Sequence, residues 1–94
     1  MSENLGKLVV NASRDISIAP GRYLLSFSQG GAWLRNGLAY LDLTGYVNGS
    51  YFSWICGNIS SMMNVVINAS GITITINEGM GTDINCSCTK IKAY

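Results

Sequence analysis

Side chains suited to acid–base chemistry are few in this sequence. It contains five carboxylates and no histidine. The missing histidine removes the commonest general base, the Ser/His and Cys/His nucleophile pairs and most zinc sites. Glycoside hydrolysis needs two carboxylates that face each other, and only Glu78 and Asp83 are close in the sequence. We therefore predict that the chain is not an enzyme.

Two segments offer metal-ligating groups. The loop EGMGTD, residues 78–83, is glycine-rich but lacks the alternating acidic ligands of a calcium site. Cys86 and Cys88 together with Cys56 supply three thiols, which form an incomplete ligand set without histidine. We interpret the loop as a hairpin connection and the thiols as core residues, and we predict no metal and no cofactor.

The three cysteines are expected to be free and buried. An odd number excludes complete pairing within the chain. Cys86 and Cys88 lie two apart on one strand face, which is a poor geometry for a mutual disulfide. A bond from Cys56 to Cys86 or Cys88 across a sheet remains an alternative.

Aromatic residues offer recognition rather than reaction chemistry. Six of them cluster in the middle third of the chain: Trp33, Tyr40, Tyr46, Tyr51, Phe52 and Trp54. Strand alternation sends Phe52 and Trp54 inward and Tyr51 outward. Exposed rings beside Asn and Ser side chains are rigid and amphipathic, which suits contact with a sugar or a neighbouring subunit. The candidate binding residues are Trp33, Tyr40, Tyr46 and Tyr51, and the alternative is that these rings belong to the core.

Charge and hydropathy limit the classes of partner that we expect this chain to bind. The six Lys and Arg residues are dispersed and the net charge is +1, whereas a phosphate-binding surface needs converging cations. No run approaches 18 apolar residues, and MSENLGK at the start lacks the apolar segment of a signal peptide. We therefore expect no nucleic acid, no membrane span and synthesis in the cytoplasm without a signal peptide, followed by incorporation into a virion. The Asn-x-Ser triplets are then not glycosylated.

Hydrophobic residues alternate with polar ones along most of the chain, which predicts about eight short strands and no helix longer than a turn. The segments with this pattern are Lys7–Ala12, Asp15–Ile18, Arg22–Ser28, Trp33–Arg35, Leu38–Leu43, Gly45–Val47, Ser50–Cys56, Met62–Asn68, Gly71–Asn77 and Ile84–Ala93. In Gly71–Asn77 the isoleucines point inward and the threonines outward. In Ile84–Ala93 the hydrophobic phase changes, which predicts a bulge near Cys88–Lys90.

Turn residues separate these segments. Pro20-Gly21 precedes one strand, and Asn36-Gly37 and Asn48-Gly49 each lie between alternating segments. Asn-Gly in that setting predicts a two-residue hairpin turn, because both central positions of a type I′ turn require a positive φ.

Length and composition complete the fold prediction. The 94 residues are 48% hydrophobic and only 12% charged, which indicates one domain over residues 1–94 with a loose start at residues 1–6. We predict an all-β fold, a small antiparallel β-sandwich of jelly-roll-like form. Because few charges keep copies apart, we also expect a homo-oligomer.

The segment Pro20–Ser28, PGRYLLSFS, resembles the strand that follows a Pro-Gly turn in C1q/TNF-like trimeric β-heads and in β-domains of phage tail fibres and tail needles. The order of Gly71–Asn77 followed by Ile84–Ala93 is also similar to theirs. The resemblance implies a homotrimer that serves as a structural protein of a tail and binds a receptor, a surface carbohydrate or a neighbouring subunit. The alternative is a small cytosolic binding protein of a phage or mobile element that sequesters a host protein or small molecule.

Overall fold

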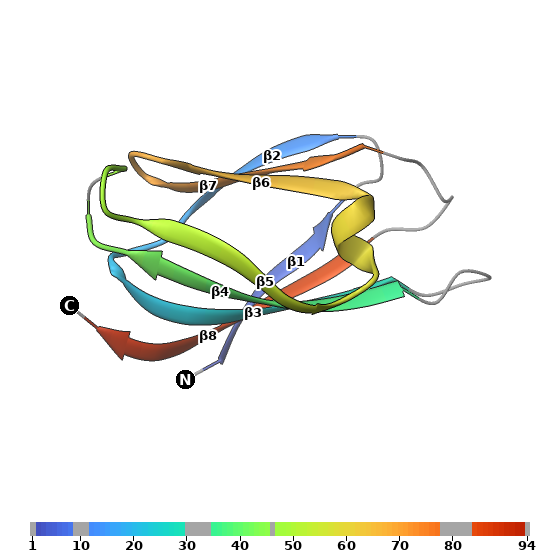
Figure 1. Ribbon diagram of the computed structural model, residues 1–94, viewed down its shortest axis with the longest axis horizontal. Coiled ribbons are helices and arrows are strands. Elements are labelled where there is room, and N and C mark those ends of the chain that lie inside the picture. The colour runs from blue at the N-terminus through green and yellow to red at the C-terminus, as the bar shows by residue number, and fades with distance from the viewer. Residues whose placement is uncertain (1, 9–11, 30–34, 46, 78–83, 94) are drawn as a thin grey trace.

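The chain folds into two antiparallel β-sheets that pack face to face (Figure 1). The computed structural model describes residues 2–8, 12–29, 35–45, 47–77 and 84–93, except for the side chains of residues 2–5 and 93. This architecture confirms the predicted all-β sandwich. No helix among these residues is long and apolar enough to cross a membrane.

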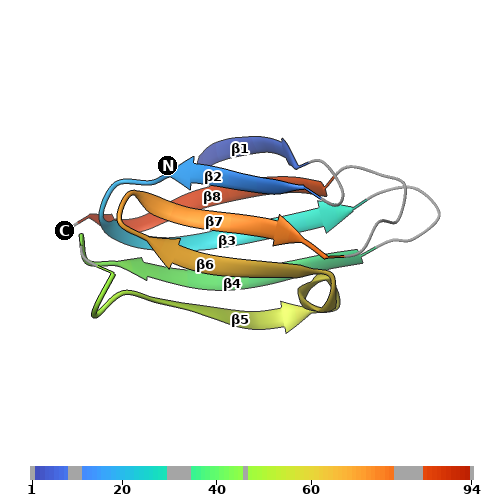
Figure 2. The same cartoon turned by 90° about the horizontal axis from the view of Figure 1, so that it is seen from above.

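Five strands form the larger sheet, in the order β1-β8-β3-β4-β5. Their bounds are β1 Ser2–Leu8, β3 Gly21–Gln29, β4 Arg35–Leu43, β5 Tyr51–Gly57 and β8 Ile84–Ala93. The smaller sheet has the order β2-β7-β6 and covers the middle of the larger one (Figure 2). Its strands are β2 Ser13–Ser17, β6 Met63–Asn68 and β7 Gly71–Ile76, and a single 3-10 turn, η1 Ile59–Ser61, joins β5 to β6.

Pairings between the two ends of the chain define the topology. β1 pairs with β8, and β2 pairs with β7. These nested antiparallel pairs give the fold its jelly-roll-like character. The described part of the segment expected to be loose, residues 2–6, lies in β1. β8 is ten residues long and provides the edge with which β1 pairs. The residue types near the N-terminus do not reveal this pairing partner.

The core lies between the sheets and follows the strand alternation. In β3, Tyr23, Leu25 and Phe27 are buried, whereas Ser26 and Ser28 are exposed. The isoleucines of β7 also point inward, as predicted from their spacing. A fully buried side chain of this size contributes about 1.5–3 kcal/mol of transfer free energy, so a one-residue slip of β3 or β7 is strongly disfavoured.

The Asn36-Gly37 turn prediction is wrong, because both residues lie inside β4. Gly37 pairs with Phe27 of β3 and Gly57 of β5. A Cβ on Gly37 would stand 2.6 Å from the Ile59 side chain and 3.1 Å from that of Trp54. The glycine is therefore required by close packing on the inner face of the sheet and not by a turn.

Asn48-Gly49 forms a turn in the connection between β4 and β5, but this connection runs from Thr44 to Ser50, so the predicted two-residue hairpin loop is wrong. Gly49 has φ +93°, and the Ser50 amide donates to the Val47 carbonyl at 3.3 Å. The predicted strand Gly45–Val47 is absent, because both of its described residues, Gly45 and Val47, lie in bends of this connection. Trp33 and Leu34 of the predicted strand Trp33–Arg35 lie outside the described residues, and Arg35 begins β4.

A bulge changes the phase of β8, two residues beyond its predicted centre. Arg22 pairs with Lys92 and Tyr23 with Lys90, so Ile91 is the inserted residue. Ile91 remains 54% exposed. The bulge therefore absorbs the phase change without bringing Ile91 into the core, contrary to what the sequence pattern indicated.

The cysteines divide into two classes. Cys86 and Cys88 are buried and free, as predicted, but Cys56 is exposed, so its predicted burial is wrong. Strands β3 and β4 separate β5 from β8. At about 4.8 Å per strand spacing, that separation excludes a disulfide from Cys56 to either partner. Burial, followed by the neighbouring Cys88, raises the pKa of Cys86 from 9.0 to about 12.

Candidate binding surface and end pocket

Two of the predicted aromatic residues meet on the outer face of the larger sheet. Tyr40 of β4 pairs with Ser53, so Tyr51 of β5 lies diagonally across from it. The Tyr40 and Tyr51 ring centroids are 5.7 Å apart at 57°. Tyr51 is 53% exposed and Tyr40 is half-buried. The sheet thus holds two phenol rings in a fixed orientation at the surface.

An ion pair adjoins these rings on the same face. Asp42 is the cross-strand partner of both Arg22 and Tyr51. The Arg22 Nε and the Asp42 carboxylate are 3.7 Å apart, with Arg22 the more exposed of the two. Arg22 therefore presents hydrogen-bond donors beside apolar ring surface. We call Tyr40, Tyr51, Arg22 and Asp42 the tyrosine surface.

The other two predicted binding residues, Trp33 and Tyr46, lie outside the described residues. Phe52 and Trp54 point inward, as predicted. Trp54 contacts Phe27 and Phe52 with ring centroids 5.2 Å away in each case. The aromatic cluster of the sequence is thus divided between core and surface by strand alternation.

The carboxylates with described side chains do not face each other. Asp15 lies on the outer face of the smaller sheet and Asp42 on the outer face of the larger sheet. Glu78 and Asp83, the pair close in the sequence, lie outside the described residues. Among the residues that the structure describes, no three His, Cys, Asp or Glu side chains gather as metal ligands do.

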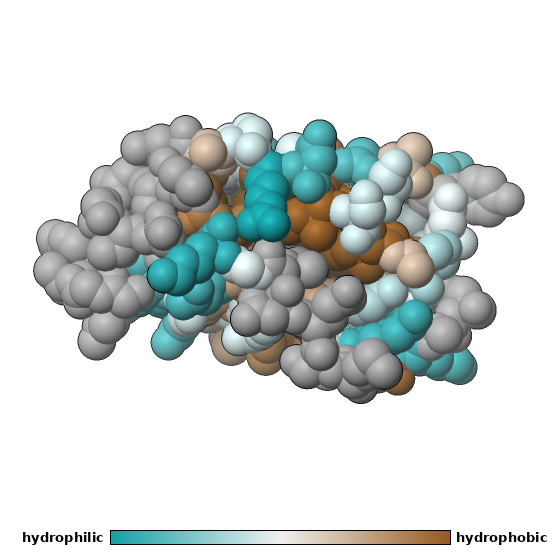
Figure 3. All heavy atoms as spheres, turned by 180° about the vertical axis from the view of Figure 1, so that it is seen from behind, coloured by the Kyte–Doolittle hydropathy of each residue, from teal (hydrophilic) through white to brown (hydrophobic). Residues whose placement is uncertain are grey.

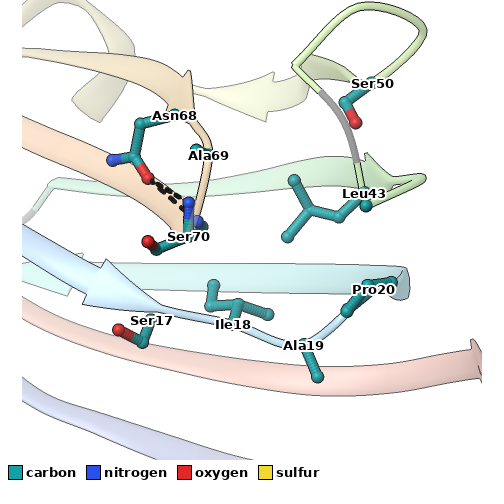
Figure 4. Close-up of a pocket in the computed structure, with 11 residues that line it drawn as sticks. Ser17, Ile18, Ala19, Pro20, Leu43, Ser50, Asn68, Ala69 and Ser70 are labelled. Atoms are coloured by element: carbon teal, nitrogen blue, oxygen red, sulfur yellow. Dashed lines mark hydrogen bonds between the residues drawn. The ribbon is translucent and has the colours of Figure 1, made fainter.

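One end of the sandwich contains a pocket of about 310 Å³. Figure 4 shows residues of the β2–β3 connection, the end of β4 and the β6–β7 turn around it. Ile18, Pro20 and Leu43 supply apolar surface, and Ser50 and Ser70 supply hydroxyl groups. None of the described residues that line the pocket is charged. The volume and lining suit a small uncharged group with one apolar face.

Hydrogen bonds fix the walls of this end pocket. The Tyr23 hydroxyl donates to the Ala19 carbonyl at 2.6 Å, which holds the connection between the two sheets. The Asn68 side-chain oxygen accepts from the Ser70 and Gly71 amides at 2.9 Å each. The tyrosine of the PGRY motif and the asparagine of NASG are therefore structural residues of the pocket.

Sequence reasoning missed the end pocket. Its walls come from residues 17–20, from Leu43, Gly45 and Ser50, and from residues 68–71, which no motif links. Ser50 lines the pocket and is followed directly by Tyr51. The pocket and the tyrosine surface thus share the same end of the molecule.

Comparison with known proteins gives a likeness of fold. The structure superposes on the crystal structure of the Acinetobacter phage vB_ApiP_P1 tailspike protein with a TM-score of 0.55 and 16% sequence identity. The match covers 98% of this chain and 21% of the tailspike chain. The fold is similar to part of a phage tailspike. No family model and no curated protein matches the sequence.

The likeness to a tailspike agrees with the resemblance to phage tail β-domains drawn from the Pro20–Ser28 segment. At this level of identity the comparison concerns the fold alone. The resemblance to C1q/TNF-like heads stays a prediction. The chain spans about a fifth of the tailspike's length, so a whole tailspike's activity and partners are a separate question.

Proposed function

We propose that this chain is a non-catalytic structural and binding module of a phage or virion tail. It assembles as a homo-oligomer, with a trimer favoured, and recognises a cell-surface ligand or a neighbouring subunit. The likeness in fold to part of a phage tailspike supports the proposed place of the chain in a phage or virion tail. The proposal involves no cofactor and no chemical step.

The observation that carries the binding role is the Tyr40–Tyr51 pair. Tyr51 is 53% exposed, so a binding partner can still bury much of its ring. The contact with the Tyr40 ring already orients the Tyr51 ring. A preoriented ring loses little conformational freedom on binding. The Arg22 and Asp42 side chains alongside add polar contacts that select among partners. The tyrosine surface therefore suits a sugar ring or a polar protein surface.

The direct test is binding to a glycan array and to purified neighbouring tail proteins. We expect Tyr51→Ala to weaken binding at least tenfold, because it removes the exposed ring. Tyr51→Phe, which keeps the ring and removes the hydroxyl, should weaken binding less than Tyr51→Ala.

Ile91→Ala is the matched control, since Ile91 is 54% exposed and lies on β8. It should leave binding unchanged, and circular dichroism should show that all three variants are folded. Equal affinity of Tyr51→Ala and the unmodified chain for every ligand that binds would contradict the proposed role of the tyrosine surface.

A further inference from the structure

A long part of the chain carries no charge. Residues 43–77 contain no Asp, Glu, Lys or Arg. This segment includes β5, η1, β6 and β7. β5 is an edge strand of the larger sheet and β6 is an edge strand of the smaller one. Figure 2 shows both on the same side of the sandwich, and we call β5, η1 and β6 the uncharged flank.

The core is least covered along the uncharged flank. Among the residues that the structure describes, five hydrophobic side chains that pack on the core are only partly buried. Four of them lie on β5 or β6: Phe52, Trp54, Val65 and Ile67. On the same strands, Ile55 is 54% exposed and Val66 is 53% exposed. Val66 pairs with Thr73 and so lies on the outer face of the smaller sheet, on its edge strand. The flank thus combines open strand edges with apolar side chains.

The opposite flank is built differently. It is formed by β1 and β2, which carry Lys7, Arg14 and Asp15. The Arg14 guanidinium donates to the Lys7 carbonyl at 3.0 Å and so bridges the two sheets. Figure 3 views the molecule from the side opposite to Figure 1 and shows hydrophilic side chains that lie over the hydrophobic interior. The β1–β2 flank thus carries charged residues, whereas β5, η1 and β6 contain none.

Natural sheets protect exposed edges with charges, prolines or bulges, because an open edge pairs with other chains. β5 and β6 contain neither charge nor proline. β5 has a bulge at Ile55, between the Leu38–Cys56 and Ala39–Trp54 pairs. β6 pairs with β7 in continuous register, so its free edge is regular. The uncharged flank therefore lacks most of the usual protection, and β6 lacks it entirely.

We infer that the uncharged flank packs against the same flank of other copies of this chain, around the symmetry axis of a homo-oligomer. Only the side chains closest to such an axis face their own counterparts, and a charge there would face a like charge. The residues of β5, η1 and β6 bring no charge to such a contact, although the Arg35 guanidinium of β4 reaches the Ser61 hydroxyl of η1 at 3.5 Å. A charged partner would lose hydration against β5 and β6 without a compensating ion pair. This inference rests on the proposed oligomer and names its contact surface.

The size of the flank is sufficient for such a contact. Seven residues of β5 extend about 23 Å, and the molecule is 20–22 Å across its shorter axes. The flank therefore covers about 500 Å² of each copy, or about 1,000 Å² for two copies, which reaches the usual lower bound of a specific interface.

The test introduces one positive charge on each edge strand. Ile55→Lys and Val66→Lys are compared with Ile91→Lys, whose position is 54% exposed and also lies at a bulge of the larger sheet. Sedimentation equilibrium over a range of concentrations measures assembly. We expect each flank variant to raise the dissociation constant at least tenfold and Ile91→Lys to change it less than twofold.

Two results would separate the inference from the proposed function. If the unmodified chain is an oligomer and both flank variants assemble as tightly as it does, the contact lies elsewhere and the inference is overturned. If the unmodified chain is a monomer at all concentrations, the proposed oligomer fails as well.

Hydrogen exchange of the unmodified chain gives a second readout that needs no substitution. Amides of β5 and β6 should exchange more slowly above the dissociation constant than below it, whereas β1 and β2 amides should not change. Equal exchange of β5 and β6 at both concentrations would also overturn the inference.

Discussion

Tyr51 and Phe52 show how one strand position decides the role of a residue. They are adjacent in β5, yet Tyr51 is 53% exposed beside Tyr40, and Phe52 packs against the core. Alternation along the strand separates them. The aromatic cluster thus contributes to the stability of the fold through its inward members and to recognition through its outward ones.

Cys86 links the buried core to a pH dependence of stability. Burial raises the pKa of its thiol from 9.0 to about 12. The unfolded thiol ionises above pH 9 while the folded one stays neutral, so this stabilisation is complete below pH 9 and is lost as the pH rises toward 12.

We expect the free energy of unfolding to fall by about 1.4 kcal/mol between pH 8 and pH 10 from this group alone. Urea denaturation at the two pH values measures the fall. Cys86→Val is the reference, because it keeps a buried side chain of similar size and cannot ionise. The prediction is wrong if the unmodified chain and Cys86→Val lose equal stability over this range.

At the scale of elements, polar side chains tie the strands of the smaller sheet together on its outer face. The Thr73 hydroxyl of β7 donates to the Asp15 carboxylate of β2 at 2.6 Å and accepts from the Asn68 amide of β6 at 2.8 Å. One hydroxyl therefore bridges all three strands. Thr75, two residues along β7, shares a single hydrogen bond with Ser13 at 3.0 Å.

Thr73→Val should lower the free energy of unfolding by about 1–2 kcal/mol, since two hydrogen bonds are lost and a β-branched shape is kept. Thr75→Val should change it by less than about 0.5 kcal/mol. Urea denaturation of both variants gives the comparison. A loss for Thr75→Val as large as that for Thr73→Val would show that the bridging hydroxyl has no special role.

The sequence was informative where a strand buries one face. The alternation in Gly71–Asn77 predicted which side chains point inward, and the period of two in Arg22–Ser28 predicted a strand buried on one face. Asn48-Gly49 predicted a turn. Asn36-Gly37 failed because the same dipeptide is also compatible with a strand whose glycine admits Ile59 and Trp54. Nothing in the local sequence distinguishes these cases, since the deciding contact comes from a residue 22 positions away.

The candidate site shows the same limit. Tyr40 and Tyr51 were candidates from residue type, with Tyr51 placed outward by strand phase, and the structure brings the two rings together. The end pocket was not predicted, because its walls come from three connections that approach one another only after both sheets have formed. The open edges of β5 and β6 likewise depend on strand order, which alternation does not specify.

At the scale of the whole molecule, we infer an assembled module from three features. They are the charge-free segment, the two open strand edges and the Tyr40–Tyr51 pair. Copies of the chain would contact one another through the strand edges of the uncharged flank. Tyr51, although part of β5, lies beside Tyr40 on the outer face of the larger sheet and would remain available to a ligand. The fold of the chain is similar to part of a phage tailspike.

The most direct test of this account is the mass of the purified chain in solution, measured by sedimentation equilibrium at micromolar concentration. We expect an assembly of several 10.1 kDa copies, with three favoured. A mass of 10.1 kDa that does not rise with concentration would contradict it.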